Sequence, residues 1–506
     1  MSENKNKPAQ WKSEEQRMAR KARLAEMKSK DGGKKQIRTA NPLTRLITII
    51  VLVIALLVTS LWAIVRSGLP HRELVAVAIG DHTLSAVDIN YYYYQQLASY
   101  GLDPTNPETK ATLDAPSGME GFKTNADFIK DQAIQQLRED VLLAEQAALK
   151  GLSLSAEESE SVENYISGMA ANATKEGKSL DNFLAAAYGT GMNEKVLRRC
   201  VDRMLLADLF AQDKISAFTH TDEDLQKAYD KTPEQYDLID YRVFYHAANI
   251  KTEATEAEKT KAMEISRKAA DNMLTKITDE ASFRSQSVVY AADADKEAYR
   301  DDDISLNRSK YYSNISPSQV RDWLFEADRA TGDKAVIEST SGYYVVMFLN
   351  RTKGEFEQVN VRHILTVARN GTATTEQITA AKQKAEKILA DYQAGEQTEE
   401  AFAELAKQNS EDGNAAQGGL YEGVYKGQMV TEFEDWCFNP ARKTGDTGIV
   451  QTDFGFHVMY YVGTNGVDWK IRTRDLLNSE AYQQYLEELG TQNPYTIRSF
   501  GFRFVG

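Results

Sequence analysis

The chain has 506 residues, of which 42% are hydrophobic and 26% charged, and its formal net charge is −14. This length exceeds one ordinary core and predicts about three or four domains, while the apolar content excludes a disordered chain. The acidic balance argues against general nucleic-acid binding, which needs a basic face. Two cysteines, Cys200 and Cys437, are too few for a disulfide framework or a Cys-rich zinc site.

The charge is unevenly distributed along the chain. Residues 1–45 contain thirteen basic and five acidic side chains, a net charge of +8, so the remaining 461 residues carry −22. Leu46–Val65 follows as 20 residues without a charge, a length that matches the hydrocarbon core of a bilayer if the segment is helical. Trp62 lies near its far end, where an aromatic side chain suits the membrane interface.

These features predict an uncleaved single-pass anchor at 46–66. A cleaved signal peptide is one alternative, but the basic leader is long and no small-residue cleavage site follows Val65. A buried core helix is another alternative, although few core helices are apolar on all sides. The positive-inside rule then places the basic tail 1–45 in the cytoplasm and the chain after the span outside the membrane.

Residues 74–235 are predicted to form a helical lobe. Gly151 is expected to end one helix, and Ser155 with Glu158 forms a capping box that begins the next. The Tyr91–Tyr94 run lies on a predicted helix, where tyrosines are more often half-buried packing than a binding surface. Packing is therefore the favoured interpretation of these four tyrosines.

The C-terminal segment 467–506 is predicted to contain a helix and a strand. Asp475–Leu489 has helical character, and Thr496–Val505 alternates like a strand with phenylalanines on one face. A terminal segment of this kind is expected to dock onto the N-terminal lobe and complete it.

An internal repeat marks the second half of the chain. Asp435–Asp446 matches Asp322–Asp333 at an offset of 113 with seven of twelve positions identical, where chance gives about one. Each copy is followed by a predicted strand and preceded by a strand, a long amphipathic helix and a second helix. The chain therefore contains two related units, 236–352 and 355–464.

The second unit carries a series of motifs in a fixed order. They are Val361–Leu365, Phe402–Ala406, Asn409–Asp412, Gly418-Gly419, Lys426–Val430, Phe433–Asp435, Thr444–Asp446 and Thr452–His457. In this order and spacing they resemble the parvulin family of peptidyl-prolyl cis/trans isomerases. The resemblance implies two tandem α+β units, each a small antiparallel sheet flanked by helices, within a multidomain α+β protein.

The resemblance also implies roles for individual residues. His363 and His457 are expected to face each other across neighbouring strands, with Asp412 orienting their hydrogen bonds as the third catalytic residue. The implied substrate-binding residues are Met429, Phe433, Phe438, Phe454 and Phe456. Each residue also has a plainer interpretation: a satisfied strand histidine, a turn aspartate, or ordinary apolar core.

The implied reaction explains why such residues are needed. Rotation about an X-Pro bond breaks amide resonance against a barrier of roughly 18–20 kcal/mol. No bond has to form or break, so an apolar pocket with a few fixed polar groups can favour the twisted state. The reaction needs no cofactor, and no Cys, Asp or Glu spacing around the histidines supports a metal site. Cys437 is expected to be buried rather than reactive.

The first unit lacks the matching histidines. Aligned with the second unit, it has Val243 in place of His363 and Tyr344 in place of His457. His246 lies nearby, but an odd shift in register turns it to the other face of the sheet. The first unit is therefore predicted to be a degenerate parvulin-like domain for binding or spacing.

One loop of the second unit departs from the family pattern. The family commonly has Asp-Leu-Gly after the paired glycines, where this chain continues as Leu420-Tyr421-Glu422-Gly423. The loop beneath the expected site is therefore predicted to differ, with a consequence for catalytic efficiency.

Three stretches of the helical lobe are Ala148–Ser155, Tyr188-Gly189 and Leu197–Arg199. They resemble the chaperone region of the SurA, PpiD and PrsA families of bacterial cell-envelope foldases. The resemblance implies a membrane-anchored isomerase and chaperone that assists the folding of translocated proteins. Its expected partners are unfolded polypeptides with X-Pro bonds, the lipid bilayer and the secretion machinery, but no nucleic acid. A non-catalytic holdase and an assembly factor for an envelope complex are the alternatives.

Overall fold

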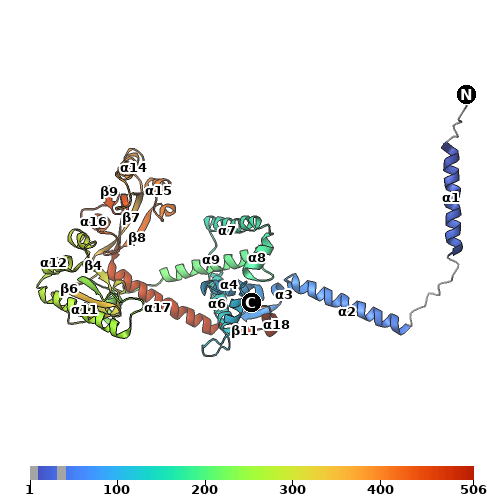
Figure 1. Ribbon diagram of the computed structural model, residues 1–506, viewed down its shortest axis with the longest axis horizontal. Helices are drawn as coiled ribbons and strands as arrows, with labels where there is room; N and C mark the ends of the chain where they lie inside the picture. Colours follow the sequence, from blue (N-terminus) through green and yellow to red (C-terminus); the bar gives the residue numbers. More distant parts are fainter. Residues whose placement is uncertain (1–8, 31–41) are drawn as a thin grey trace, which may run out of the picture. The chain divides into compact units, whose positions relative to one another are not determined.

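The computed structural model describes residues 9–30 and 42–506, with side chains in the ranges 14–26, 50–301 and 303–506. The chain forms two compact units, one containing the residues up to Phe210 with Gly490–Gly506, and one containing Ala211–Leu489. Both units combine helices with small antiparallel sheets (Figure 1). The predicted multidomain α+β class is confirmed.

Two long helices come first in the chain. They are α1 (Ala9–Lys30) and α2 (Pro42–Arg66). Within the residues that the structure describes, no helix is both long and apolar enough to cross a membrane. The predicted span 46–66 begins outside the described side chains, which within α2 start at Ile50, and much of the predicted tail 1–45 also lies outside the described residues.

The lobe is built from helices around a three-stranded sheet of order β11-β1-β2. Its helices are α3 (Leu69–Glu73), α4 (Ala86–Ser99), α5 (Pro107–Asp114), α6 (Asn125–Lys150), α7 (Ala156–Lys175), α8 (Leu180–Tyr188), α9 (Glu194–Ser216) and α18 (Ser499–Phe502). Its strands are β1 (Val75–Ile79), β2 (His82–Ser85) and β11 (Tyr495–Ile497). The predicted helix boundary is confirmed: Gly151 ends α6 at φ 76°, and Ser155 and Glu158 cap α7 reciprocally.

The tyrosine run of α4 packs inside the lobe. Tyr91, Tyr92 and Tyr93 are each less than 5% exposed. Tyr92 donates its hydroxyl proton to Asp140 Oδ2 at 2.7 Å, which satisfies the polar end of a buried ring. The predicted packing role of this run is confirmed.

The C-terminal strand is much shorter than expected. The predicted strand over 496–505 is wrong, because β11 covers only Tyr495–Ile497 and α18 follows it. The reason is a close backbone contact: a Cβ atom on Gly501 would lie 2.1 Å from the carbonyl oxygen of Val75. The chain turns at this contact instead of continuing as a strand.

The lobe also ends earlier in the sequence than the expected boundary at 235. Helix α10 (Asp222–Lys231) lies in the second compact unit with most of α17 (Asp468–Gln492). Leu225 of α10 packs in one core cluster with Trp469 of α17. Burial of this apolar face against α17 keeps α10 out of the lobe.

The second compact unit contains two four-stranded antiparallel sheets with the same strand order. The first, β4-β3-β6-β5, consists of β3 (Asp237–Ala247), β4 (Leu306–Tyr311), β5 (Lys334–Ser339) and β6 (Gly342–Lys353), with α11 (Glu256–Lys276), α12 (Glu280–Tyr290) and α13 (Ser318–Leu324). The second, β8-β7-β10-β9, consists of β7 (Glu357–Val367), β8 (Leu420–Val424), β9 (Thr447–Thr452) and β10 (Gly455–Val467), with α14 (Thr375–Ala394), α15 (Glu399–Asn409) and α16 (Thr431–Cys437). The sequence repeat therefore corresponds to a repeat in topology.

The repeated residues make the same contacts in both copies. Arg329 Nε donates to the Trp323 carbonyl at 3.1 Å, and Arg442 Nε donates to the Trp436 carbonyl at 3.1 Å. Each guanidinium also lies over the ring of its tryptophan, at 3.9 and 4.1 Å from the centroid. Identical contacts explain why these positions share their residue types.

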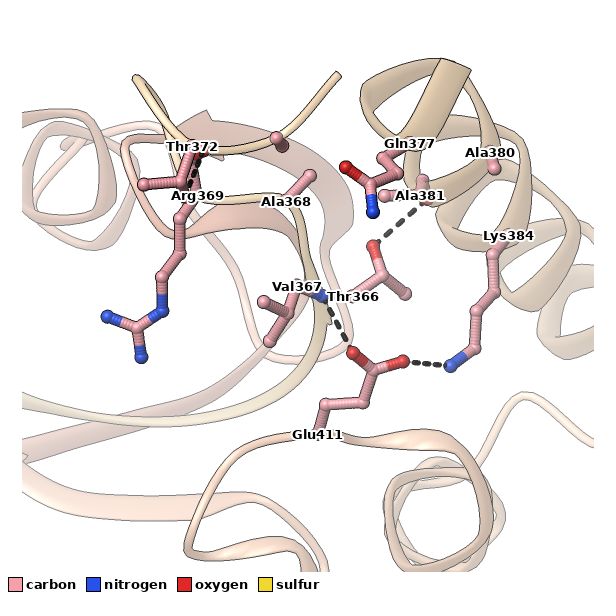
Figure 2. Close-up of a pocket in the computed structure, with 11 residues that line it drawn as sticks. Thr366, Val367, Ala368, Arg369, Thr372, Gln377, Ala380, Ala381, Lys384 and Glu411 are labelled. Atoms are coloured by element: carbon pink, nitrogen blue, oxygen red, sulfur yellow. Dashed lines mark hydrogen bonds and ion pairs between the residues drawn. The ribbon is translucent and has the colours of Figure 1, made fainter. Parts of the chain in front are cut away.

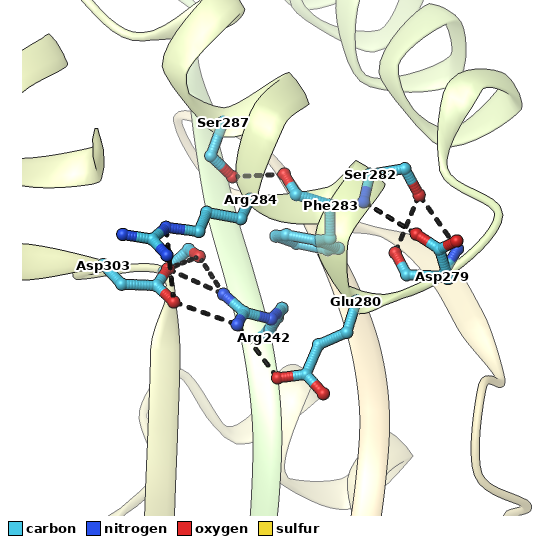
Figure 3. Close-up of polar contacts among 9 residues, drawn as sticks. Arg242, Asp279, Glu280, Ser282, Phe283, Arg284, Ser287 and Asp303 are labelled. Atoms are coloured by element: carbon cyan, nitrogen blue, oxygen red, sulfur yellow. Dashed lines mark hydrogen bonds and ion pairs between the residues drawn. The ribbon is translucent and has the colours of Figure 1, made fainter. Parts of the chain in front are cut away.

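An arginine links sheet and helix in each copy, buried in the first and partly buried in the second. Arg242 of β3 binds Glu280 at the start of α12 at 2.9 Å, and Arg362 of β7 binds Glu399 at the start of α15 at 2.9 Å. In the first copy Arg242 also binds Asp303, as Figure 3 shows. Nearly complete burial of a guanidinium requires such carboxylate partners.

The two faces of the second sheet bury different cores. Alternation along β10 sends Phe456, Val458 and Tyr460 into a cluster with residues of α14 and α15. Met459 and Tyr461 face the other way, into a cluster with residues of α16 such as Phe433. The histidine of β10, at position 457, belongs to the α16 face because it alternates with Met459.

Candidate active site

Two buried histidines meet on the α16 face of the second sheet. His363 lies on β7 and His457 on the adjacent strand β10, and they are 2% and 6% exposed. Their Nδ1 atoms are 3.0 Å apart, and the rings are nearly parallel with centroids 5.3 Å apart. These two residues are the pair predicted to face each other on neighbouring strands, and the structure brings them into contact.

Asp412 lies at the outer edge of this pair, in the turn after α15. Its Oδ2 atom is 3.3 Å from His363 Nε2, although the two atoms are not aligned as a full hydrogen bond. The same oxygen accepts a proton from the Tyr421 hydroxyl at 3.1 Å and from the Asn414 backbone N–H at 3.2 Å. The contact with His363, helped by these donors, holds the pKa of Asp412 well below its usual range.

Thr452 completes the chain of polar contacts at the other end. Its Oγ1 atom is 2.8 Å from His457 Nε2 and accepts the backbone N–H of Phe454 at 3.1 Å. This residue was not predicted from the sequence. The feature that could have identified it is a hydroxyl side chain at the end of β9, five residues before the histidine in the same hairpin.

These contacts define where the protons lie. The ionised Asp412 carboxylate can only accept, so a neutral His363 carries its proton on Nε2 and accepts at Nδ1. Thr452 Oγ1, which accepts the Phe454 N–H, donates to His457 Nε2. His457 then carries its own proton on Nδ1 and donates it to His363 Nδ1. This arrangement applies to two neutral imidazoles, whose tautomers are then set by their neighbours.

Electrostatics keep His457 uncharged. Burial, with a smaller contribution from His363, lowers the pKa of His457 to about 4. The imidazole therefore stays uncharged at neutral pH. The nearby thiol offers no nucleophile either, because burial raises the pKa of Cys437 to about 12. This site is arranged for non-covalent chemistry.

The apolar side of the site comes mainly from α16. Phe433 is 3% exposed, and its ring meets both histidines edge-on, with centroid distances of 5.6 Å to His363 and 5.4 Å to His457. Met429 and Phe438 are half-buried and pack against the same core cluster. The structure thus brings three of the five predicted apolar residues to the histidine face.

The two remaining phenylalanines have different positions. Phe456 as a substrate-binding residue is wrong: it is 4% exposed in the core beneath α14, on the opposite face of the sheet. Strand alternation requires this, since Phe456 is adjacent to His457 in sequence. Phe454 lies in the turn between β9 and β10 and is 43% exposed. It connects to the site through its backbone N–H to Thr452.

The loop that departs from the family pattern takes part in the site. Gly419, at φ 68°, accepts the His363 backbone N–H at 2.9 Å. The ring of Tyr421 lies 5.1 Å from that of His363, and its hydroxyl binds Asp412. Tyr421 is thus a second site residue that was not predicted, although the loop that contains it was expected to differ from the family pattern.

The first sheet has no equivalent pair. By strand register, Val243 pairs with Val346 as His363 pairs with Met459, and Tyr344 pairs with Tyr245 as His457 pairs with Leu365. His246 packs instead against Phe244, Tyr290 and Met273, beneath α11 and α12. The predicted register of His246 is confirmed.

A separate hollow lies beside the C-terminal end of β7 (Figure 2). Its volume is about 430 Å³, and Thr366, Arg369, Gln377, Lys384 and Glu411 supply its polar lining. Glu411 binds both Lys384 and the Val367 N–H, and Thr366 donates to the Ala381 carbonyl. None of the predicted site residues lines this hollow, so it is distinct from the histidine pair.

Comparison with known proteins identifies the second unit. Residues 344–462 match the family model of the PPIC-type PPIASE domain, which is the parvulin-type isomerase domain. The match covers the complete second sheet apart from the C-terminal end of β10, and it begins within β6.

Curated relatives are chaperones named SurA. The chain is 26% identical over 300 residues to Chaperone SurA of Chromohalobacter salexigens, which covers 56% of this chain and 62% of that protein. It is 23% identical over 326 residues to Chaperone SurA of Pseudomonas aeruginosa, which covers 63% of this chain and 73% of that protein. The match thus spans less than two thirds of the first relative.

Among solved structures, PrsA from Bacillus subtilis matches 75% of this chain and 93% of its own at 15% identity, with a TM-score of 0.29. So low a TM-score carries no argument about the fold. The likeness to known proteins therefore rests on the sequence matches to the PPIC-type domain and to SurA.

Proposed function

Because the chain carries a parvulin-type domain of the kind found in SurA-, PpiD- and PrsA-like foldases, we propose that it is a peptidyl-prolyl cis/trans isomerase and chaperone for extracytoplasmic proteins. The observation that carries the proposal is the buried His363–His457 pair with Phe433 against both rings. A polar network with fixed protons beside an apolar wall suits a prolyl peptide, which presents an amide and a hydrocarbon ring together.

The proposed reaction lowers the barrier to rotation about the X-Pro bond. The twisted amide has less charge separation than the planar one, so an apolar, water-poor pocket formed by Phe433 and Met429 favours it. The polar pair holds the neighbouring peptide group in position. A barrier lowered by about 5 kcal/mol would accelerate rotation several-thousand-fold.

We assign the isomerase activity to the second unit. Val243 and Tyr344 occupy the histidine positions in the first unit, and neither can form the pair. The first unit then serves binding or spacing.

Isomerisation of a proline tetrapeptide by the soluble fragment 67–506 tests the proposal. His457→Gln and Met429→Ala should each lower kcat/KM by about 10- to 100-fold, because one breaks the polar pair and the other opens the apolar wall. Tyr344→Phe is the matched control at the equivalent position of the first unit and should leave kcat/KM unchanged. A folded fragment without activity would leave the non-catalytic holdase as the function, measured as suppressed aggregation of an unfolded client.

We also propose that α2 anchors the protein in the cell membrane, with the N-terminus in the cytoplasm. Its described apolar side chains are exposed, among them Leu56 at 68% and Leu61 at 62%, a pattern that lipid contact would satisfy. Arg66 lies over the Trp62 ring at 5.0 Å at the end of the apolar stretch, where interfacial residues are favoured. The full chain should stay in the membrane fraction after alkaline carbonate extraction, and the fragment 67–506 should be released. Release of both would contradict anchoring by this segment.

A further inference from the structure

Met429 lies in the loop 425–430 between β8 and α16. This loop contacts the first of the two repeated units, 236–352, as well as its own sheet. Gly427 lies in this loop at φ 81°, and a Cβ atom there would be 2.2 Å from the carbonyl oxygen of Ser309 in β4. Lys310, the next residue of β4, donates its Nζ proton to the Gly427 carbonyl at 3.2 Å. The two backbones therefore touch directly.

The same glycine is tied to the helix that forms the apolar wall. The Gly427 N–H donates to Glu434 Oε2 at 2.6 Å. Glu434 follows Phe433 on α16, and Met429 lies two residues after Gly427. A displacement of Gly427 would thus reach Phe433 and Met429, two of the apolar residues on the histidine face.

A buried carboxylate fixes β4 against this loop. Asp468 is fully buried, and it accepts protons from Tyr311 of β4 at 2.5 Å, from Gln358 of β7 at 2.9 Å and from Arg472 of α17 at 3.0 Å. We call these four residues the Asp468 junction. It joins the first sheet, the second sheet and α17 through one charge, whose burial is tolerated only while its partners remain.

The junction also reaches the loop itself. The guanidinium of Arg472 lies 3.8 Å from the ring centroid of Tyr311 and 4.4 Å from that of Tyr425, at the start of the loop. The Tyr311 and Tyr425 rings meet edge-on at 5.5 Å. Tyr311 therefore holds the loop by its ring and the Asp468 junction by its hydroxyl.

We propose that the first unit positions the proline pocket of the second unit, with Tyr311 and Lys310 as positioning residues for Met429 and Phe433. The inference rests on the proposed isomerase function of the second unit. It gives the copy without the histidine pair a role: a rigid support that sets the geometry, and hence the activity, of its partner within the chain.

The test uses the fragment 67–506 with Tyr311→Phe, which keeps the ring but removes the bond to Asp468. Displacement of the pocket should lower kcat/KM for a proline tetrapeptide by about tenfold. Lys310→Met removes the contact with Gly427 and the positive charge near Glu434, and it should give a smaller loss. Tyr312→Phe is the matched control, since its hydroxyl binds Asp322 at 2.9 Å within the first unit.

A spectroscopic measurement separates positioning from general destabilisation. With methyl-labelled methionine, the Met429 resonance should shift in Tyr311→Phe and Lys310→Met, while that of Met459, buried in the sheet of the same unit, should not. Tyr311→Phe behaving like Tyr312→Phe in both measurements would overturn the inference. An inactive parent fragment would refute the isomerase proposal instead, and the Met429 resonance would then decide the positioning role alone.

Discussion

The histidine pair has a direction because its two ends differ chemically. At one end a backbone N–H can only donate, and at the other an ionised Asp412 can only accept. When both rings are neutral, the accepting carboxylate directs the protons from Thr452 towards Asp412. The carboxylate keeps this role over a wide pH range, since contact with His363 lowers the pKa of Asp412.

Removal of the Thr452 hydroxyl should separate catalysis from stability. Thr452→Val leaves His457 Nε2 buried without a donor, which should cost about 1–3 kcal/mol and lower kcat/KM by roughly tenfold or more. Thr366→Val is the control, because Thr366 is also buried and donates its hydroxyl proton, but to the Ala381 carbonyl on the other face. Denaturant melts should show both variants destabilised, while only Thr452→Val loses activity. Equal activity in both variants would exclude Thr452 from the site.

The lowered pKa of His457 predicts the pH dependence of the second unit. The folded value of about 4 lies below the ordinary value of 6.5, so the unfolded chain binds more protons between these limits. The contribution to stability is complete above about pH 6.5 and is lost as the pH falls towards 4. Isomerase activity should accordingly be flat from about pH 8 to 5 and decline only near pH 4.

The activity profile and a proton NMR titration of the imidazoles would check this. His246→Gln is a matched control, since burial also lowers the pKa of His246 to about 4 but in the first unit. That variant should leave the activity profile unchanged. A midpoint of activity near pH 6.5 would mean that His457 titrates as an exposed histidine.

The site residues show which parts of the site can be predicted from the sequence and which cannot. His363, Asp412 and His457 stood at motif positions, and two strands and a turn bring them together. Thr452 and Tyr421 were missed because their roles depend on which way a hairpin and a loop turn their side chains. Phe456 was misplaced although strand alternation alone assigns it to the face opposite His457.

At the level of elements, a glycine turn holds the strand that carries His363. Gly419 has φ 68°, and a Cβ atom there would lie 2.1 Å from the His363 carbonyl oxygen. The turn therefore brings β8 into backbone contact with β7. No other residue type fits this contact without moving one of the strands.

Gly419→Ala should consequently destabilise the second unit by more than its dihedral strain, about 3 kcal/mol or more, and abolish most isomerase activity. Gly371→Ala isolates the strain alone, since Gly371 has φ 75° and nothing within 4 Å of its Cβ position. It should cost about 1 kcal/mol with activity retained. Chemical denaturation of both variants measures the difference in the free energy of unfolding. Equal losses of stability would show that β7 and β8 can move apart to accommodate the added methyl group.

Elements with local signals were predicted well, and those set by distant contacts were not. The boundary between α6 and α7 followed from Gly151, Ser155 and Glu158, all close in sequence. The strand expected at 496–505 failed because Gly501 packs against Val75, more than four hundred residues away in the chain. Helix α10 was likewise predicted in the wrong domain, because its position depends on packing against Trp469, which is distant in the sequence.

At the scale of the whole molecule, the lobe is assembled from both ends of the described chain. Ile497 of β11 pairs with Val77 of β1, and the Gly506 N–H donates to Asn90 Oδ1 at 2.9 Å. Val505 is only 3% exposed, and the Phe504 ring meets that of His71 at 4.9 Å. Residues 490–506 thus supply an edge strand and part of the core.

Loss of this tail should unfold the lobe. Burial of one aliphatic side chain contributes about 1.5–3 kcal/mol, and the tail adds a strand and several ring contacts to that. Total stability of a domain is only about 5–15 kcal/mol, so the fragment 67–210 should lose cooperative thermal melting by circular dichroism.

A fusion that restores the tail distinguishes an effect of the missing tail from an effect of the chosen fragment boundary. Residues 67–210 joined through a flexible Gly/Ser linker to 490–506 should regain a cooperative melt, because the linker restores the tail at high effective concentration. The same fusion with Gly501→Val should fail, since the side chain would collide with the Val75 backbone. A cooperative melt of 67–210 alone would instead mean that the lobe folds without the tail. The tail would then serve only to hold the end of α17 near β1.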